Sequence, residues 1–201
     1  MKAEALGVRR LAGAVVLTAM LPLTAMGQTG GGAQPAAPAQ TGAATRSGAA
    51  TPADAAARAE AGFERYSALI REAVAARNDG RHEDSLRSIA QAEAIDEAEN
   101  VVSMPTQFHK GLTLAAMNRH EEAIAAFDRG LTVQKDYPFA WWHRALSDEA
   151  LGRRDAARAD LERFGSLIGP WTRQRGKLDP QRRVEFREKL AQYGLERKYR
   201  F

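Results

Sequence analysis

Residues 105–133, PTQFHKGLTLAAMNRHEEAIAAFDRGLTV, and residues 139–167, FAWWHRALSDEALGRRDAARADLERFGSL, align 34 positions apart. Small residues fall on small residues, and the large apolar Phe127 falls on Leu161. Other aligned pairs are Gly111 with Ala145, Leu114 with Asp148, Arg119 with Arg153 and Ala123 with Ala157. A period of this length is typical of helix–turn–helix units that bury their apolar faces only by stacking on one another. The sequence therefore predicts an all-α repeat array, a class that holds partners more often than it converts substrates.

A weaker copy of the same pattern lies upstream, where Ala73, Gly80, Ser85 and Ile89 fill the matching positions. Apolar residues recur at helical spacing, and Gly, Asn or Pro separates the helical segments. The helices expected from these signals cover residues 55–78, 81–95, 105–117, 120–133, 139–151 and 154–168, followed by one final helix after Asp179-Pro180. The alternative that these observations leave open is a plain helical bundle without superhelical stacking.

Over residues 66–168 the pattern resembles the tetratricopeptide repeat family. The resemblance rests on small residues at slots 8 and 20 of each unit and a large apolar residue at slot 24. These slots hold Ala73, Gly111 and Ala145; Ser85, Ala123 and Ala157; and Ile89, Phe127 and Leu161. Slot 7 departs from the family by holding the charged residues Glu72, Lys110 and Arg144, and the first two units are 38 residues apart. The resemblance implies an α-solenoid of about three hairpins that serves as a non-enzymatic protein-interaction scaffold.

In the family, the first helix of each hairpin lines a concave groove that binds a peptide or a helix. Carried onto this sequence, the groove presents Arg71, Phe108, His109, Leu112, Phe139, Trp142, His143 and Leu146. Aromatic side chains are frequent anchors at such interfaces because they bury a large area for few frozen torsions. The alternative interpretation is that the aromatic row packs internally and that a terminal helix covers the groove.

The first 27 residues have the layout of a secretory signal peptide. Lys2, Arg9 and Arg10 precede an apolar run over residues 11–23, and Ala25-Met26-Gly27 provides small residues for cleavage. This run is too short to span a bilayer, so we expect export to the periplasm or the outside with no membrane anchor after cleavage. An uncleaved anchor or a buried helix is the alternative. Residues 28–54 are rich in Gly, Ala, Pro and Gln and are predicted to be a disordered linker.

Residues 169–201 are predicted to end the sixth helix at Gly169-Pro170 and to add a basic helix that caps the last repeat. Residues 171–201 contain ten Lys/Arg against four Asp/Glu. A second interpretation is that this segment contacts an anionic membrane, polysaccharide or protein surface. Its candidate residues are Arg173, Arg175, Lys177, Arg182, Arg183 and Arg187.

The sequence contains no catalytic constellation that would indicate an enzyme. It has no Cys, which excludes disulfides, zinc–thiolate sites and thiol catalysis. His109 and His143 occupy equivalent slots, but two imidazoles without a neighbouring carboxylate are a weak metal signal. We therefore expect no cofactor, no metal and no nucleic-acid partner. Two functions remain, an exported scaffold that binds a protein through its groove, and an envelope component held by its basic C-terminal segment.

Overall fold

The computed structural model describes residues 51–199, which belong to one compact unit. Within this part of the chain the secondary structure is entirely helical. The helices are α1 (Pro52–Asn78), α2 (His82–Ala98), α3 (Met104–Ala116), α4 (His120–Val133), α5 (Pro138–Ala150), α6 (Arg154–Arg175) and α7 (Pro180–Gln192). None of them is long and apolar enough to cross a membrane. The predicted signal peptide, residues 1–27, and most of the predicted linker lie outside the described residues.

Local sequence signals set where the helices begin and turn. The Oγ1 atom of Thr51 accepts a hydrogen bond from the backbone of Asp54 at 3.1 Å, and the Asp54 carboxylate accepts one from the backbone N–H of Thr51 at 3.0 Å. This capping box starts α1 at Pro52, so residues 52–54 belong to the helix and not to the predicted linker. At the turns between paired helices, Gly80 and Gly152 adopt φ of 76° and 74°, a region that glycine enters without a Cβ clash.

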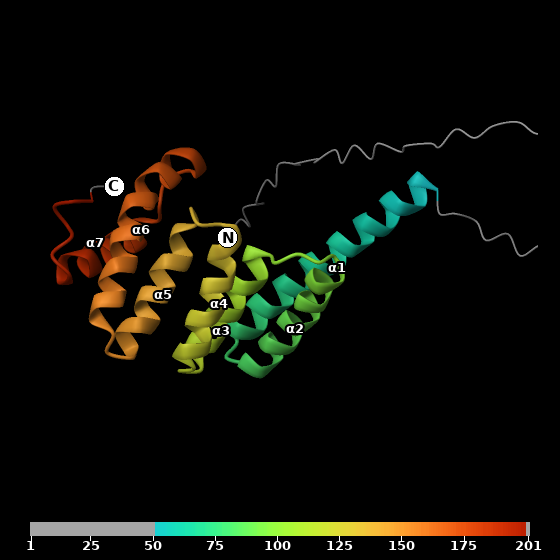
Figure 1. Cartoon of the computed structure of the whole chain (residues 1–201), viewed down its shortest axis with the longest axis horizontal. Coiled ribbons are helices and arrows are strands. Elements are labelled where there is room, and N and C mark those ends of the chain that lie inside the picture. Colours follow the sequence, from blue (N-terminus) through green and yellow to red (C-terminus); the bar gives the residue numbers. More distant parts are fainter. Residues whose placement is uncertain (1–50, 200–201) are drawn as a thin grey trace, which may run out of the picture. The chain divides into compact units, whose positions relative to one another are not determined.

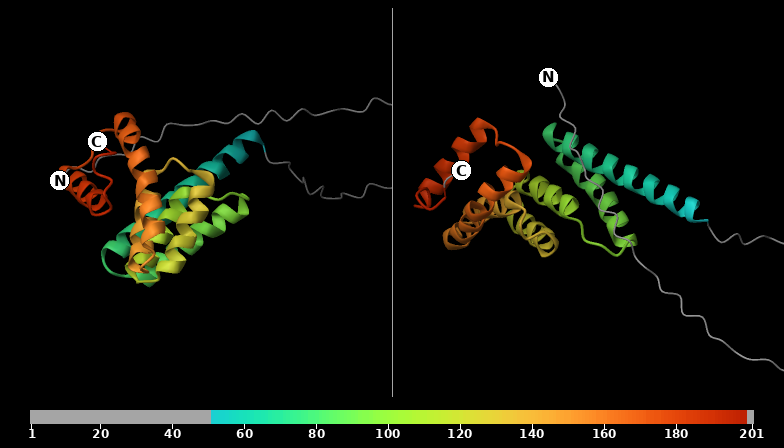
Figure 2. Two further views of the ribbon diagram at one scale, coloured as in Figure 1. Left: turned by 60° about the vertical axis from the view of Figure 1, so that its left-hand side comes forward. Right: turned by 90° about the horizontal axis from the view of Figure 1, so that it is seen from above.

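The helices pair as three antiparallel hairpins, α1 with α2, α3 with α4, and α5 with α6 (Figure 1). Successive hairpins also contact each other, because α2 packs on α3, α4 on α5, and the first helices α1, α3 and α5 touch in turn. Figure 2 shows the hairpins side by side from two further directions. The predicted fold class is confirmed: the chain is an α-solenoid of three tetratricopeptide-like hairpins followed by α7.

Small residues at the predicted crossings allow the paired helices to approach closely. A Cβ atom on Gly111 of α3 would lie only 2.4 Å from the ring of Phe127 on α4, so this position has room for hydrogen alone. Phe127 is fully buried, as is its counterpart Leu161 one unit later. The 34-residue register read from the sequence is therefore also the register of side-chain packing.

Two further predicted helix boundaries, at the ends of the second and sixth helices, were wrong. The sixth helix does not end at Gly169-Pro170 but continues to Arg175, with Pro170 inside it. Proline removes one helical hydrogen bond, yet the ring of Trp171 packs edge-on against Phe139 of α5 at 4.8 Å between centroids. This contact packs the last turns of α6 against α5. The second helix likewise extends beyond Ile95 to Ala98.

Candidate functional site

The first helices of the three hairpins share one surface, which we name the first-helix face. Most of the predicted groove residues on it are half-buried, including His109, Leu112, His143 and Leu146, and Arg71 is exposed. Leu112 and Leu146 are 34 residues apart and occupy the same slot of consecutive units. The structure therefore brings these predicted residues to one surface, where part of each side chain reaches solvent.

The C-terminal end of the first-helix face is covered by the chain itself. Trp142 is only 2% exposed, because its ring lies 4.5 Å from that of Phe186 on α7 and 5.0 Å from that of Phe164 on α6. Phe139 contacts Trp171 and Phe186 in the same way. Trp142 and Phe139, which the sequence placed in an open groove, therefore pack internally against α6 and α7.

Ion pairing strengthens this closure. The carboxylate of Glu149 on α5 accepts hydrogen bonds from the Lys189 ammonium at 2.8 Å and from the Tyr193 hydroxyl at 3.2 Å. Glu149 belongs to the same row of groove slots as Leu146. The third hairpin thus uses its apolar and its charged groove positions to bind the C-terminal part of its own chain.

The two histidines lie in an aromatic cluster at the middle of the face. The ring of Phe108 lies 5.5 Å from His109 and 5.7 Å from His143, and the His143 ring stacks on Phe127 at 6.3 Å. Burial, with the positive charge of Arg77, lowers the pKa of His109 to about 4. Burial, with the charges of Arg182 and Arg77, lowers the pKa of His143 to about 4. Both imidazoles are therefore neutral at pH 7, and they form part of an uncharged aromatic layer.

Arginine side chains border this layer. An Nη1 atom of Arg77, at the end of α1, lies 3.3 Å from Nδ1 of His109. Burial lowers the pKa of the Arg77 guanidinium, and within residues 51–199 no carboxylate lies at ion-pair distance from it. The charge of Arg182 acts on both His143 and Tyr137. The accessible part of the face consequently combines apolar side chains with cations that have no counter-ion among residues 51–199.

Two of the three charged residues at slot 7, which departed from the family pattern, have structural partners. Lys110 of α3 pairs with Glu93 of α2 at 2.8 Å. Arg144 of α5 donates to the buried carboxylate of Asp160 from Nε at 2.7 Å and from Nη2 at 2.6 Å, and it also pairs with Asp128 of α4. These pairs join neighbouring helices, so the slot 7 charges act as links in the array.

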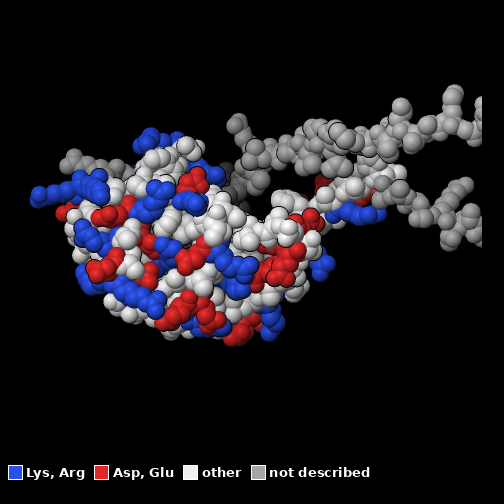
Figure 3. All heavy atoms as spheres, viewed as in Figure 1, with Lys and Arg blue, Asp and Glu red and all other residues white. Residues whose placement is uncertain are grey.

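The predicted basic candidates of the C-terminal segment lie on the last turn of α6, the connecting segment and α7. All six candidates are exposed, and none forms an ion pair with a carboxylate of the described residues. Figure 3 shows acidic and basic side chains mixed over the middle of the molecule and several basic ones at the α6–α7 end. The six are Arg173, Arg175, Lys177, Arg182, Arg183 and Arg187.

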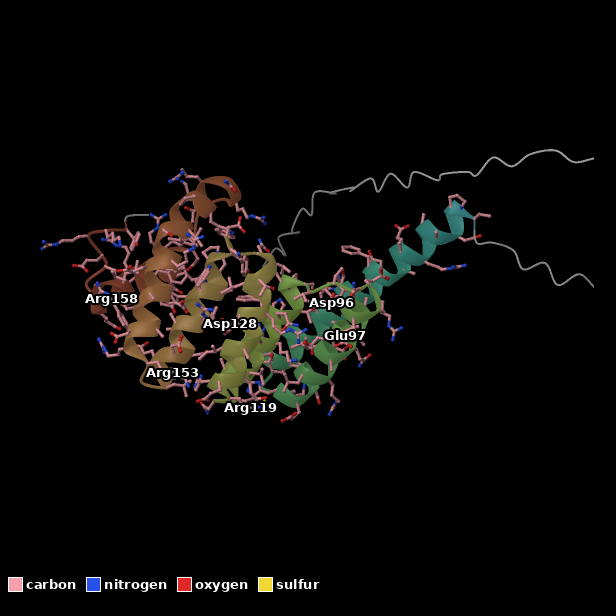
Figure 4. The ribbon with its side chains drawn as sticks, in the orientation of Figure 1. Asp96, Glu97, Arg119, Asp128, Arg153 and Arg158 are labelled. Carbon is pink, nitrogen blue, oxygen red and sulfur yellow. The ribbon has the colours of Figure 1, made fainter. Side chains whose placement is uncertain are left out.

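The opposite end carries a hollow that sequence reasoning missed. Helix α1 has 27 residues and its antiparallel partner α2 has 17, so the N-terminal part of α1 extends beyond α2 (Figure 1). Under this extension lies a hollow of about 710 Å³, lined chiefly by apolar side chains of α1 and by the end of α2. Figure 4 places Asp96 near this end of α2, whereas Arg119 and Arg153 mark the turns at the other end of the hairpins. The capping box at Thr51 and the spacing of Ala55, Ala59 and Phe63 were the signals that could have revealed it.

The described residues contain no group of three or more His, Cys, Asp or Glu side chains placed to hold a metal ion. The partly exposed side chains of the first-helix face include apolar, imidazole and guanidinium groups, which can make apolar contacts, hydrogen bonds and charge interactions.

Comparison with known proteins supports the fold. No protein-family model matches the chain, and no curated protein matches it in sequence. Among solved structures, the chain is similar to the type III secretion translocator chaperone SycD of Yersinia enterocolitica, in a crystal structure described as an alternative dimer. The two share 17% sequence identity and a TM-score of 0.52 over 65% of this chain and 94% of SycD. At this identity the likeness concerns the arrangement of helices.

Proposed function

We propose that this protein is an exported, non-enzymatic scaffold of the tetratricopeptide repeat family that binds a segment of another protein. The observation that carries the proposal is the row of partly exposed side chains on α3 and α5, the first helices of the second and third hairpins. Leu112 and His109 repeat as Leu146 and His143 one unit later, so apolar and hydrogen-bonding groups recur at a fixed spacing. A regular row of this kind suits an extended peptide or an amphipathic helix.

The charge of the face narrows the class of partner. Arg77 is half-buried without a carboxylate partner in the described part of the chain, and Arg71 is exposed one turn and a half earlier on the same helix. A partner segment that carries Asp or Glu beside its apolar residues would supply the missing counter-ions. Export, which rests on the predicted signal peptide, would place this encounter in the periplasm or outside the cell. The neighbour SycD is a secretion translocator chaperone, a role compatible with a protein-binding helical array.

Site-specific photo-crosslinking in the producing cell tests this proposal. A photo-reactive amino acid in place of Leu112 is expected to capture a partner protein, whereas the same group in place of the exposed Ala125 of α4 is not. The double variant R71E/R77E should lose that capture while its unfolding transition stays in place. Equal capture from both positions, or capture that ignores the two arginines, would overturn the proposed face.

A second candidate function is retained because six exposed cations at the α6–α7 end have no acidic partner within the described residues. We propose as the alternative that this basic end holds the protein on an anionic envelope surface. Sedimentation with anionic vesicles or lipopolysaccharide across a salt series tests it, because such attraction is screened by salt. Binding that does not weaken with salt, or no binding at all, would remove this alternative.

A further inference from the structure

The N-terminal extension of α1 exposes an apolar face that the rest of residues 51–199 leaves uncovered. Residues 52–61 are exposed almost throughout, and about ten residues extend beyond the end of α2, which corresponds to roughly 15 Å of helix. Ala55, Ala59 and Phe63 recur at four-residue spacing and so lie on one side of this extension. The Phe63 side chain is 55% exposed, which is unusual for a large aromatic residue.

The same side of the extension forms one wall of the 710 Å³ hollow, and the opposite wall comes from the end of α2 and the start of α3. Ile95 and Pro105 supply apolar surface to that wall. A protruding apolar helix and an apolar hollow therefore adjoin each other in one molecule. This is the geometry in which a two-fold axis makes a surface complementary to itself, because each copy offers the protrusion and the recess together.

The charges of the α1 extension and of the wall facing it are also complementary. The extension carries Arg58 at the rim of the hollow, and the facing wall carries Asp96 and Glu99. Asp96 already accepts a hydrogen bond from Ser103 at 2.8 Å, whereas Arg58 and Glu99 form no ion pair within the described residues. Figure 3 shows acidic side chains grouped where α1 leaves the body of the repeats. A second α1 entering the hollow would bring a cation to an acidic wall.

The crossing point is also free of obstacles. A Cβ atom added at Gly62 meets nothing within 4 Å, so the α1 backbone is open to solvent on this side. Ala59, three residues earlier, is also small, so another helix can approach closely between Arg58 and Phe63.

We propose that two copies of this chain form a symmetric dimer in which the N-terminal part of each α1 occupies the hollow of the other copy. Phe63 is the apolar anchor, and Arg58 of one copy pairs with Glu99 of the other. Because few turns of helix meet, the interface is small, and we expect a weak dimer with a dissociation constant in the micromolar range. This inference does not depend on the proposed function of the first-helix face.

Sedimentation velocity over a series of concentrations, with the protein in the form in which it accumulates in the cell, measures the dimer directly. Phe63→Glu should raise the dissociation constant at least about tenfold, since it removes the anchor and introduces a charge into an apolar interface. Ala57→Glu is the matched control, because it adds the same charge to an exposed position on the other side of the extension and should leave the constant unchanged. Unfolding of both variants at the wild-type denaturant concentration shows that the fold is intact.

Mixing two charge variants separates contact between copies from contact within one copy. Arg58→Glu and Glu99→Arg should each weaken the homodimer, because every 58–99 contact then joins like charges. An equimolar mixture of the two should form a heterodimer, in which both contacts again join opposite charges.

Three results would overturn the proposal. They are a wild-type chain that stays monomeric into the hundreds of micromolar, a dimer indifferent to Phe63→Glu, and variants whose mixture does not associate. If the wild-type chain is monomeric while a photo-reactive group at Phe63 captures a different protein, the hollow belongs to that protein. If the dimer forms but the first-helix face captures no partner, the proposed function fails and the dimer stands.

Discussion

The two ends of this helical array differ in how far the described residues cover them. At the C-terminal end, α7 and the last turns of α6 cover the third hairpin, and Phe186 and Leu190 are almost completely buried. At the N-terminal end, α1 extends beyond its partner helix, Phe63 is exposed and a hollow stays open. One end of the stack is covered from within the chain, whereas the described residues leave the other end uncovered. The difference indicates that associations of this protein should be sought on the parts of the array that α6 and α7 do not cover.

The sharpest test of this comparison replaces one phenylalanine at each end. Phe186→Ala should lower the free energy of unfolding by about 3–5 kcal/mol, because it opens a cavity among Trp142, Phe164 and its other neighbours. Phe63→Ala should change it by no more than about 0.5 kcal/mol in dilute monomeric protein, because the ring is already exposed. Urea unfolding measures both. Equal losses in the free energy of unfolding would show that the two ends are covered to the same extent.

A second test compares the ion pairs that link neighbouring helices. Arg144→Met leaves the buried carboxylate of Asp160 without its two donors and should cost about 3 kcal/mol. Lys110→Met breaks a more exposed pair with Glu93, where the expected loss is about 1 kcal/mol or less. Denaturant midpoints at constant m-value report the two losses. A larger effect at Lys110 would contradict the view that the array is held most firmly at its covered end.

Two glycines sharpen the comparison at the level of single carbon atoms. Gly111→Ala places a Cβ against the ring of Phe127 and should destabilise the central hairpin by about 1–3 kcal/mol. Gly62→Ala, in the open extension, meets no neighbour and should stabilise α1 by up to about 1 kcal/mol. Thermal melts of the two variants decide the matter, and stabilisation by Gly111→Ala would show that the crossing is looser than the structure has it.

The smallest expected effect concerns pH. The pKa of His143 in the folded chain is lowered to about 4. In the unfolded chain this imidazole takes up a proton near pH 6.5, whereas in the folded chain it stays neutral until the pH is much lower. Stability is therefore complete above pH 7 and is lost as the pH falls from about 7 toward 4. His143→Phe should reduce the loss between pH 7.5 and pH 5 by on the order of 1–2 kcal/mol. Urea midpoints at the two pH values measure it, and an unchanged pH dependence would place the titration elsewhere.

The sequence predicted the hairpins well because each repeat unit can be compared with the next. Gly111 and Phe127 had counterparts 34 residues away, so a pattern too weak to interpret once became clear when seen twice. The slot 7 charges were recognised as departures, but their partners were not, because Asp160 and Glu93 lie on other helices and pairing across helices leaves no periodic trace.

The candidate site was harder to predict for a related reason. Trp142 occupies a groove slot, and only the path of α7 decides whether such a slot faces solvent or Phe186. That path follows a turn near Gly176, with φ of 105°, after a helix that continues through Pro170. Neither feature repeats within the chain, so no second copy was available to reveal it. His109 and Leu112 of the second hairpin, in contrast, are partly exposed on the first-helix face, where the 34-residue register places them.

The packing of α7 against the third hairpin also limits where hairpins can be added or lost during evolution. Phe186 fits between Trp142 and Phe164, and Lys189 reaches Glu149, so α7 is matched to side chains of the third hairpin. At the positions of Trp142 and Phe164 the second hairpin carries Phe108 and Gly130. It therefore lacks the pair of aromatic side chains between which Phe186 packs. A duplicated or deleted hairpin is therefore tolerable only ahead of α5, and descendants of this chain would lengthen from the N-terminal side while keeping the same last sixty residues or so.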